Sequence, residues 1–179
     1  MSIRIGPECS MSGTGETMSD ATIYTIGHSN QTVENLVGLL RQHGVELVAD
    51  VRSSPSSRYN PQFNREQLAA ALRENGIEYA FHGDSLGGRP SDPGCYDGNE
   101  INYASVREKD WFREGLACVC REAATRVIVL LCAEENPNKC HRQKLLAPEL
   151  LKEGATVIHI RGDGSLEEAT GKQEQLRLL

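Results

Sequence analysis

Short apolar runs alternate along the chain with longer segments in which apolar residues recur every three or four positions. Each run is bounded by turn residues and is too short for a typical helix, which favours a buried β-strand. The runs are Thr22–Gly27, Val45–Val51, Ile77–His82, Val127–Leu131 and Thr156–Ile160. The alternation predicts an α/β fold, a doubly wound three-layer sandwich with a mostly parallel five-stranded sheet. We expect the strands, numbered along the chain, to lie in the order 3-2-1-4-5.

The intervening helices have recognisable ends. Thr32 can cap a first helix that Gly44 ends, and Asn64, with Gln67 three residues later, has the pattern of a capping box. A third helical stretch runs from about Tyr103 to Ala124, with a break near Asp110. We expect a further helix from an Asn138 cap to about Lys152, which Pro148 should kink or split.

The domain organisation follows from length and composition. Residues 1–20 are rich in Ser, Gly and Thr, lack periodicity and are predicted to be a flexible leader. Residues 21–179 are expected to form a single α/β domain, which is large enough for a substantial core. The acidic tail after Gly162 is expected to form a last short helix.

The overall charge and the lengths of the apolar runs limit the kinds of molecule that the protein is expected to bind. The formal net charge is −6 and the pI is about 5.4, which argues against a protein that coats nucleic acid. No apolar run approaches the roughly 20 residues that span a bilayer, and no signal peptide is evident. We therefore expect no membrane association. The six cysteines are expected to be reduced thiols in a cytoplasmic protein.

The ends of the predicted strands carry most of the reactive side chains. Parallel strands all end on one edge of a sheet, where α/β proteins bind ligands. The candidates for proton transfer or nucleophilic attack are His28, Cys132, Cys140 and His141, and the candidate ligand-binding residues are Ser29, Asn30, Arg52, Arg58, Glu134 and Arg142. If the first and fourth strands are neighbours, His28 faces Cys132.

The segment Val127–Arg142, VIVLLCAEENPNKCHR, is the most informative. It begins as an apolar strand and changes at Cys132, within one residue, into polar and reactive side chains. His141 and Arg142 would lie in the first turn of the following helix, where the dipole disfavours cations by about 0.3–1 kcal/mol each. Either Glu134 or Glu135 offsets this charge internally, or an anion bound by Arg142 does so.

The two cysteines of this segment allow several chemistries. Cys132 can be a small core residue, a nucleophile or a persulfide carrier, and Cys140 is a second nucleophile candidate. Cys140 and His141 could also form half of a metal site with Cys132 or His159. With no CxxC pair, we assign no metal ligand and no cofactor from the sequence.

Five blocks, in order along the chain, resemble one known family. They are TIGHSN (25–30), DVRSSPSSRYNPQFN (50–64), LGGRP (86–90), LLCAEENPNKCHR (130–142) and VIHI (157–160). Together, from about Thr22 to Arg161, they resemble the bacterial and archaeal domain of unknown function 488 family. The resemblance implies a Rossmann-like α/β fold and a cytosolic protein, and it implies no established reaction.

Three hypotheses for function remain. The first is an enzyme acting on a small anionic, phosphate- or nucleotide-like ligand. The second is a binding module without turnover for a nucleotide or nucleic acid, in which Tyr59 and Phe63 stack on a base. The third is a metal or thiol redox site built on Cys132, Cys140 and the histidines. The sequence does not indicate an oligomeric state.

Overall fold

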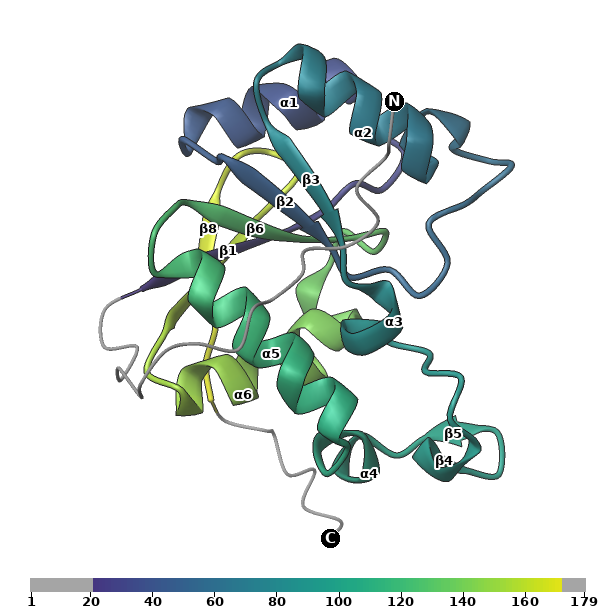
Figure 1. The fold of residues 1–179 in the computed structure, drawn as a ribbon. Helices are drawn as coiled ribbons and strands as arrows, with labels where there is room; N and C mark the ends of the chain where they lie inside the picture. The colour runs from purple at the N-terminus through teal and green to yellow at the C-terminus, as the bar shows by residue number, and fades with distance from the viewer. Residues whose placement is uncertain (1–20, 172–179) are drawn as a thin grey trace, which may run out of the picture.

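A six-stranded sheet forms the middle layer of the protein (Figure 1). The structure, a computed structural model, describes residues 21–171, so the predicted leader lies outside the described residues. The strands of this sheet are β1 (Thr22–Gly27), β2 (Leu47–Asp50), β3 (Glu78–Phe81), β6 (Ile128–Cys132), β7 (Thr156–Ile160) and β8 (Leu166–Glu168). A separate small hairpin consists of β4 (Tyr96–Asp97) and β5 (Glu100–Ile101).

The strand order is β3-β2-β6-β1-β7-β8. All neighbours pair in parallel except β7 and β8, so the predicted parallel α/β sheet is confirmed and gains one antiparallel edge strand. The predicted order is wrong in one respect, because β6 lies between β2 and β1 instead of beyond β1. β1 and β6 are nevertheless neighbours, as expected, and Gly27 is in register with Cys132. Strand β8 lies in the acidic part of the tail, where no helix forms, and the rest of the tail for which a short helix was predicted, residues 172–179, lies outside the described residues.

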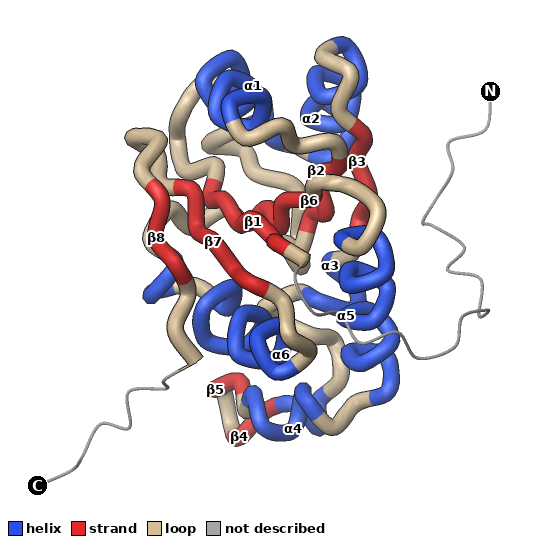
Figure 2. The backbone as a smooth tube through the Cα atoms, turned by 90° about the vertical axis from the view of Figure 1, so that its left-hand side faces the viewer, coloured by secondary structure: helices blue, strands red, loops and turns tan. Residues whose placement is uncertain are grey.

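Helices cover both faces of the sheet, which makes three layers (Figure 2). The α-helices are α1 (Val33–Gln42), α2 (Arg65–Glu74), α3 (Gly83–Leu86), α4 (Tyr103–Arg107), α5 (Asp110–Ala123) and α6 (Ala147–Lys152). Short 3-10 turns are η1 (Pro61–Phe63), η2 (Pro93–Cys95) and η3 (Pro137–Lys139), and a π-helical segment is η4 (Arg142–Leu146). Helices α1 and α2 lie over one face, and α5 and α6 lie over the other.

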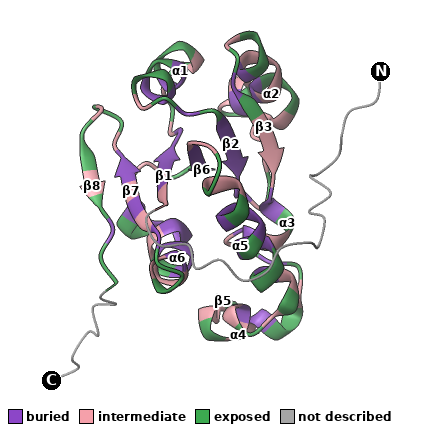
Figure 3. Cartoon of the chain, turned by 60° about the vertical axis from the view of Figure 1, so that its left-hand side comes forward, coloured by how far each residue is buried: buried purple, intermediate pink, exposed green. Residues whose placement is uncertain are grey.

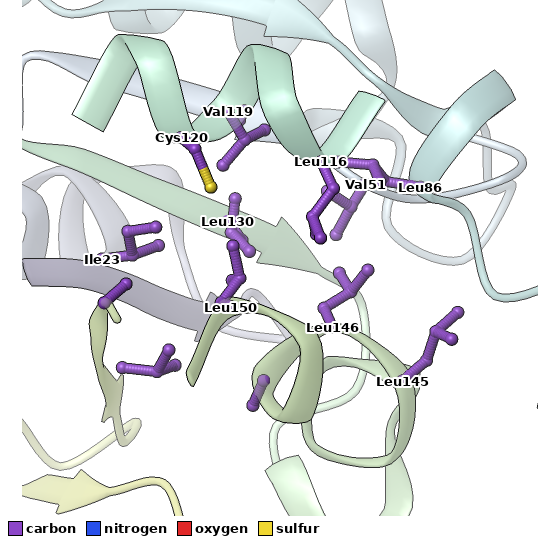
Figure 4. Packing of buried hydrophobic residues seen from close by; sticks show 14 of the residues in the cluster. Ile23, Val51, Leu86, Leu116, Val119, Cys120, Leu130, Leu145, Leu146 and Leu150 are labelled. Atoms are coloured by element: carbon purple, nitrogen blue, oxygen red, sulfur yellow. The ribbon is translucent and has the colours of Figure 1, made fainter. Parts of the chain in front are cut away.

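Each face of the sheet packs its own apolar core. Along β6, Ile128 and Leu130 join the cluster under α5 and α6, whereas Val129 and Leu131 join the cluster under α1 and α2. This is the two-residue alternation of a strand buried on both sides. Figure 4 shows Leu130 on the α5 side, packed among Leu116, Val119 and Leu150. Central strands β1, β2 and β6 are buried, whereas the edge strand β8 is largely exposed (Figure 3).

Several predicted helix ends are confirmed, and others differ. The Thr32 side chain accepts a hydrogen bond from the Asn35 N–H, and Gly44 has the positive φ of 65° expected after a helix. The break between α4 and α5 lies near Asp110, as predicted. Asn64 precedes α2 but does not cap it, because its side-chain oxygen accepts from the Ser57 N–H instead.

The segment after β6 differs most from expectation. Asn136, not Asn138, provides the side-chain cap, and it caps the 3-10 turn η3. No α-helix begins at Asn138, and the chain enters the π-helical segment η4 before α6. Pro148 in the first turn of α6 has no N–H to donate to the Lys144 carbonyl one turn earlier. The Arg107 guanidinium donates to that carbonyl instead, at 2.9 Å.

Two further findings concern the whole described chain. Within residues 21–171, no helix combines the length and apolar composition needed to cross a bilayer. The cysteines of that range, Cys95, Cys118, Cys120, Cys132 and Cys140, are all free thiols.

Candidate functional site

A pocket of about 650 Å³ opens at the carboxyl ends of β2 and β6. The strands β2 and β6 are neighbours, and the chain leaves them in opposite directions, toward β3 after β2 and toward β7 after β6. Ligand sites of α/β proteins lie at such a point, at the carboxyl ends of the strands. The lining of the pocket comes from the loops after β2 and β6, from the long loop after β3 and from the start of α4. The lining residues are Arg52, Ser53, Ser54, Gly88, Arg89, Ile101, Tyr103, Cys132, Ala133, Glu134, Lys139, Cys140 and His141.

Three reactive side chains meet in the wall of this pocket. Cys132 is the last residue of β6, and alternation along the strand places it on the α5 face. The turn η3 then folds the chain back, which brings Cys140 and His141 to the same place. The His141 Nδ1 lies 3.8 Å from the Cys132 Sγ and 3.6 Å from the Cys140 Sγ. All three potential ligand atoms lie within 4.8 Å of one another.

The His141 ring is held from its other side. Its Nε2 lies 3.0 Å from the Leu86 carbonyl oxygen, which can only accept, so Nε2 carries the proton and donates. In the neutral ring, Nδ1 then presents a lone pair to the two sulfur atoms. Gly88 packs directly against this ring, because a Cβ there would lie 2.9 Å from the His141 Cγ and Nδ1.

Negative charge in the cluster is favoured on Cys140. The Cys132 thiol donates a hydrogen bond to the Cys140 sulfur, which lowers the pKa of Cys140 below its ordinary value and raises that of Cys132. Burial opposes the thiolate at Cys140, but the charge of Arg142 favours it. Cys132, the more exposed of the two, is thus held as the thiol.

Arg142 lies beneath the pocket and does not line it. Its side chain is 0% exposed, and its guanidinium donates to the Glu134 and Glu135 carbonyls, to Thr25 Oγ1 at 3.0 Å and to Cys140 Sγ at 3.3 Å. Within the described chain, no carboxylate pairs with it. The Glu135 carboxylate instead pairs with Arg161. The internal alternative drawn from the sequence, a Glu134 or Glu135 carboxylate beside Arg142, is therefore not what the structure shows, since both residues offer Arg142 their carbonyl oxygens.

A second network supports the pocket from the β2 side. Arg52 binds Asp50 through two hydrogen bonds of 2.9 and 2.6 Å and donates to the Phe63 carbonyl at 2.9 Å. His28 Nε2 lies 3.2 Å from the Arg52 Nη1, and the His28 ring stacks on Phe63. Burial lowers the pKa of His28 to about 4. Because of its ion pair with Asp50, the positive charge of Arg52 is largely neutralised within the protein.

A comparison with known protein families shows the family to which the chain belongs. The sequence model of the family described as "Domain of unknown function DUF488" matches residues 32–147. The chain belongs to the DUF488 family. The resemblance to this family is confirmed over the matched range, which contains three of the five sequence blocks and every pocket-lining residue. The blocks at 25–30 and 157–160 lie outside that range.

Two other comparisons add little to this DUF488 protein. No curated protein matches the chain. One similar solved structure is described as "Crystal structures reveal a thiol-protease like catalytic triad in the C-terminal region of Pasteurella multocida toxin". That match has 10% identity and a TM-score of 0.44, and it covers 85% of this chain and 24% of that chain. We draw no argument from it.

The pocket unites some of the site residues predicted from the DUF488 sequence and excludes others. Those that line it are Arg52, Cys132, Glu134, Cys140 and His141. Those that do not are His28, Ser29, Asn30, Arg58 and Arg142. Arg58 is exposed and hydrogen-bonds Tyr59 at 2.8 Å, outside the pocket. Tyr59 is exposed, but Phe63 is only 1% exposed and is not accessible to stack on a base as the binding-module hypothesis requires.

Sequence reasoning missed part of the lining. Arg89 lies in the LGGRP block and Lys139 directly precedes Cys140, so a search for cations beside the blocks could have found both. Ile101 and Tyr103 enter from the hairpin β4–β5 and from α4. No sequence signal places those elements over the ends of β2 and β6.

Replacing Gly88 with alanine tests the packing of the His141 ring. The added methyl group would push the imidazole away from the Leu86 carbonyl, which should cost about 1–3 kcal/mol through overpacking and the lost hydrogen bond. Urea unfolding measures the cost. Gly38→Ala is the matched control, since Gly38 lies mid-helix in α1 with no atom within 4 Å of the new Cβ. The control should gain about 0.5–1 kcal/mol. Equal effects of the two substitutions would contradict the packing argument.

Proposed function

We propose that this DUF488 protein is an enzyme that acts on a small anionic ligand in the pocket between the ends of β2 and β6. Cys132, Cys140 and His141 form its reactive centre. The observation that carries the proposal is the convergence of two thiols and one imidazole in the wall of a pocket large enough for a nucleotide-sized compound. Pockets for small ligands span about 300–1,000 Å³, and this one falls inside that range.

The charges around the pocket favour an anion. Arg89 and Lys139 are exposed in its lining, and neither forms an ion pair with a carboxylate of residues 21–171. Glu134 is the one carboxylate of the lining, and Arg52 is already matched by Asp50. Two free cations thus oppose one free carboxylate. Ile101 and Tyr103 add an apolar wall for the organic part of a phosphate- or nucleotide-like ligand.

Binding of AMP, followed by calorimetry and by NMR of the full chain, tests the ligand class. The double variant Arg89→Glu/Lys139→Glu should weaken binding at least about tenfold, which corresponds to about 1.4 kcal/mol. Arg58→Glu is the matched control, because it reverses a cation of the neighbouring loop outside the pocket. Loss of affinity equal in both variants, or no saturable binding at low salt, would contradict the proposal.

Turnover needs a separate measurement. Chromogenic phosphomonoesters and phosphodiesters are suitable probes, and any hydrolysis should disappear in Cys140→Ser and His141→Gln while persisting in Arg58→Glu. A chain that binds AMP but turns over no probe would reduce the proposal to a binding function.

A further inference from the structure

We propose that Cys132, Cys140 and His141 bind a zinc ion whose fourth coordination position faces the pocket. The inference rests on the proposed function in one respect: the anionic ligand is the group expected to enter that fourth position. The ligand class is thereby narrowed to anions with an oxygen free to coordinate the metal.

The spacing of the donor atoms fits one ion. Zinc binds thiolate at about 2.3 Å and imidazole nitrogen at about 2.0–2.1 Å, usually in a tetrahedron. A tetrahedron with those arms has sulfur–nitrogen edges of about 3.6 Å and a sulfur–sulfur edge of about 3.8 Å. The observed sulfur–nitrogen distances are 3.6 and 3.8 Å, and the two sulfurs lie within 4.8 Å. Small side-chain rotations would suffice to place the three atoms around zinc.

The surroundings of the donors match those of metal ligands. A histidine that binds a metal commonly donates its other ring N–H to a carbonyl, which fixes the ring and its tautomer. His141 does this through Nε2 and the Leu86 carbonyl, so Nδ1 is directed at the two sulfurs. The Arg142 Nε donates to the Cys140 sulfur at 3.3 Å, which stabilises a thiolate ligand without occupying the metal.

The number of ligands indicates an open site. No fourth His, Cys, Asp or Glu of the described chain joins the group. Structural zinc sites are closed by four protein ligands, whereas catalytic sites keep three and leave one position for water or substrate. Cys132 and Cys140 both line the pocket, so the free position is accessible from it.

The charges around such a centre favour an anion in the fourth position. Two thiolates neutralise the two charges of zinc, and the neutral imidazole adds none. The buried guanidinium of Arg142 then leaves one positive charge, with no carboxylate of the described chain paired to it. Hydroxide or an anionic oxygen of the ligand would balance it. This agrees with the unpaired Arg89 and Lys139 at the pocket.

Metal analysis of the full-length chain, reduced, loaded with zinc and then dialysed, tests the proposal. We expect about one zinc per chain, and near-zero zinc in Cys132→Ser, Cys140→Ser and His141→Gln. Cys95→Ala is the matched control and should keep its zinc, because Cys95 is buried in the α5-side core and does not line the pocket. Circular dichroism confirms that each variant is folded. Zinc well below half an equivalent in the wild type, or unchanged zinc in the three site variants, would overturn the proposal.

Two readouts on the wild-type chain do not depend on variants folding. Cobalt in place of zinc should give the thiolate charge-transfer absorption and intense visible bands of a tetrahedral site. Zinc at about 100 times its dissociation constant should raise the melting temperature by about 5–10 °C. A cobalt spectrum without thiolate bands, or an unchanged melting temperature, counts against the site.

The same samples separate this inference from the proposed function. If chelated, zinc-free protein binds AMP as tightly as the loaded protein, the metal has no part in ligand binding and the inference fails, while the proposed function stands. If zinc binds with thiolate ligands but AMP does not bind, the metal site stands and the proposed ligand class fails. If AMP binds only to the loaded protein, both are supported.

Discussion

Replacing Arg142 with methionine is expected to lower the free energy of unfolding by about 3–5 kcal/mol. The guanidinium is fully buried and donates to the Glu134 and Glu135 carbonyls and to Thr25. Methionine fills a similar volume but cannot donate, so the two carbonyls would lose this donor and Thr25 would keep only its hydrogen bond with His159. Lysine should be almost as costly, because its single ammonium cannot reproduce the planar set of donors.

The measurement is urea unfolding at neutral pH, and Arg161→Met is the matched control. Arg161 forms ion pairs with Glu135 and Glu167, but its side chain is 28% exposed. Partly exposed ion pairs contribute about 0–1 kcal/mol, so the control should lose little. A loss in Arg142→Met no larger than that of Arg161→Met would show that the buried contacts of Arg142 do not stabilise the fold.

Acidification from about pH 7 to about pH 4.5 is expected to cost about 2–3 kcal/mol of stability for each of two buried histidines, His28 and His159. Burial lowers the pKa of each from 6.5 to about 4, and at His159 the charge of Arg142 adds to this. Between those two pKa values the unfolded chain binds protons and the folded chain does not. Stability is therefore complete above about pH 6.5 and falls as the pH decreases toward 4. His82, whose pKa burial also lowers, acts in the same direction.

Urea unfolding at a series of pH values measures this dependence, and its slope gives the number of protons taken up. In His159→Gln the slope should decrease by about one proton, because one titrating group is gone. The His159 Nδ1 lies 2.7 Å from the Thr25 hydroxyl, and its Nε2 lies 2.8 Å from the Gln143 side-chain oxygen. A glutamine at position 159 keeps a polar side chain beside these two groups. An identical slope in wild type and variant would refute the assignment of His159.

The fold could be predicted from the sequence where the information is local. Apolar runs with helical segments between them specified the parallel sheet, and caps such as Thr32 fixed helix ends. Strand order is different, because it depends on which buried faces fit together. The insertion of β6 between β1 and β2 is consistent with its fully apolar run, and the half-exposed β3 suits an edge. No local pattern states these neighbours directly.

The candidate site shows the same division. The sequence alone identified three reactive residues of the site, Cys132, Cys140 and His141. It did not show that they lie together, because that depends on the turn η3. Their spacing also lacks the CxxC pair that is typical of metal sites. Arg142 was assigned to an anion because it was expected at a helix start. The π-helical segment and full burial direct its guanidinium into the protein instead, and the direction of a side chain is not encoded in its neighbours along the sequence.

The borders of the sheet have a consequence for how copies of this chain meet in concentrated solution. An unpaired strand edge can recruit another chain and begin aggregation, and short or charged edges prevent this. Here one border is β8, with Glu167 and Glu168 in three residues, and the other is the four-residue β3, where Glu78 pairs with Arg126. To extend the sheet at either border, a second copy would have to desolvate a carboxylate, so growth of intermolecular β-structure from the folded state is disfavoured.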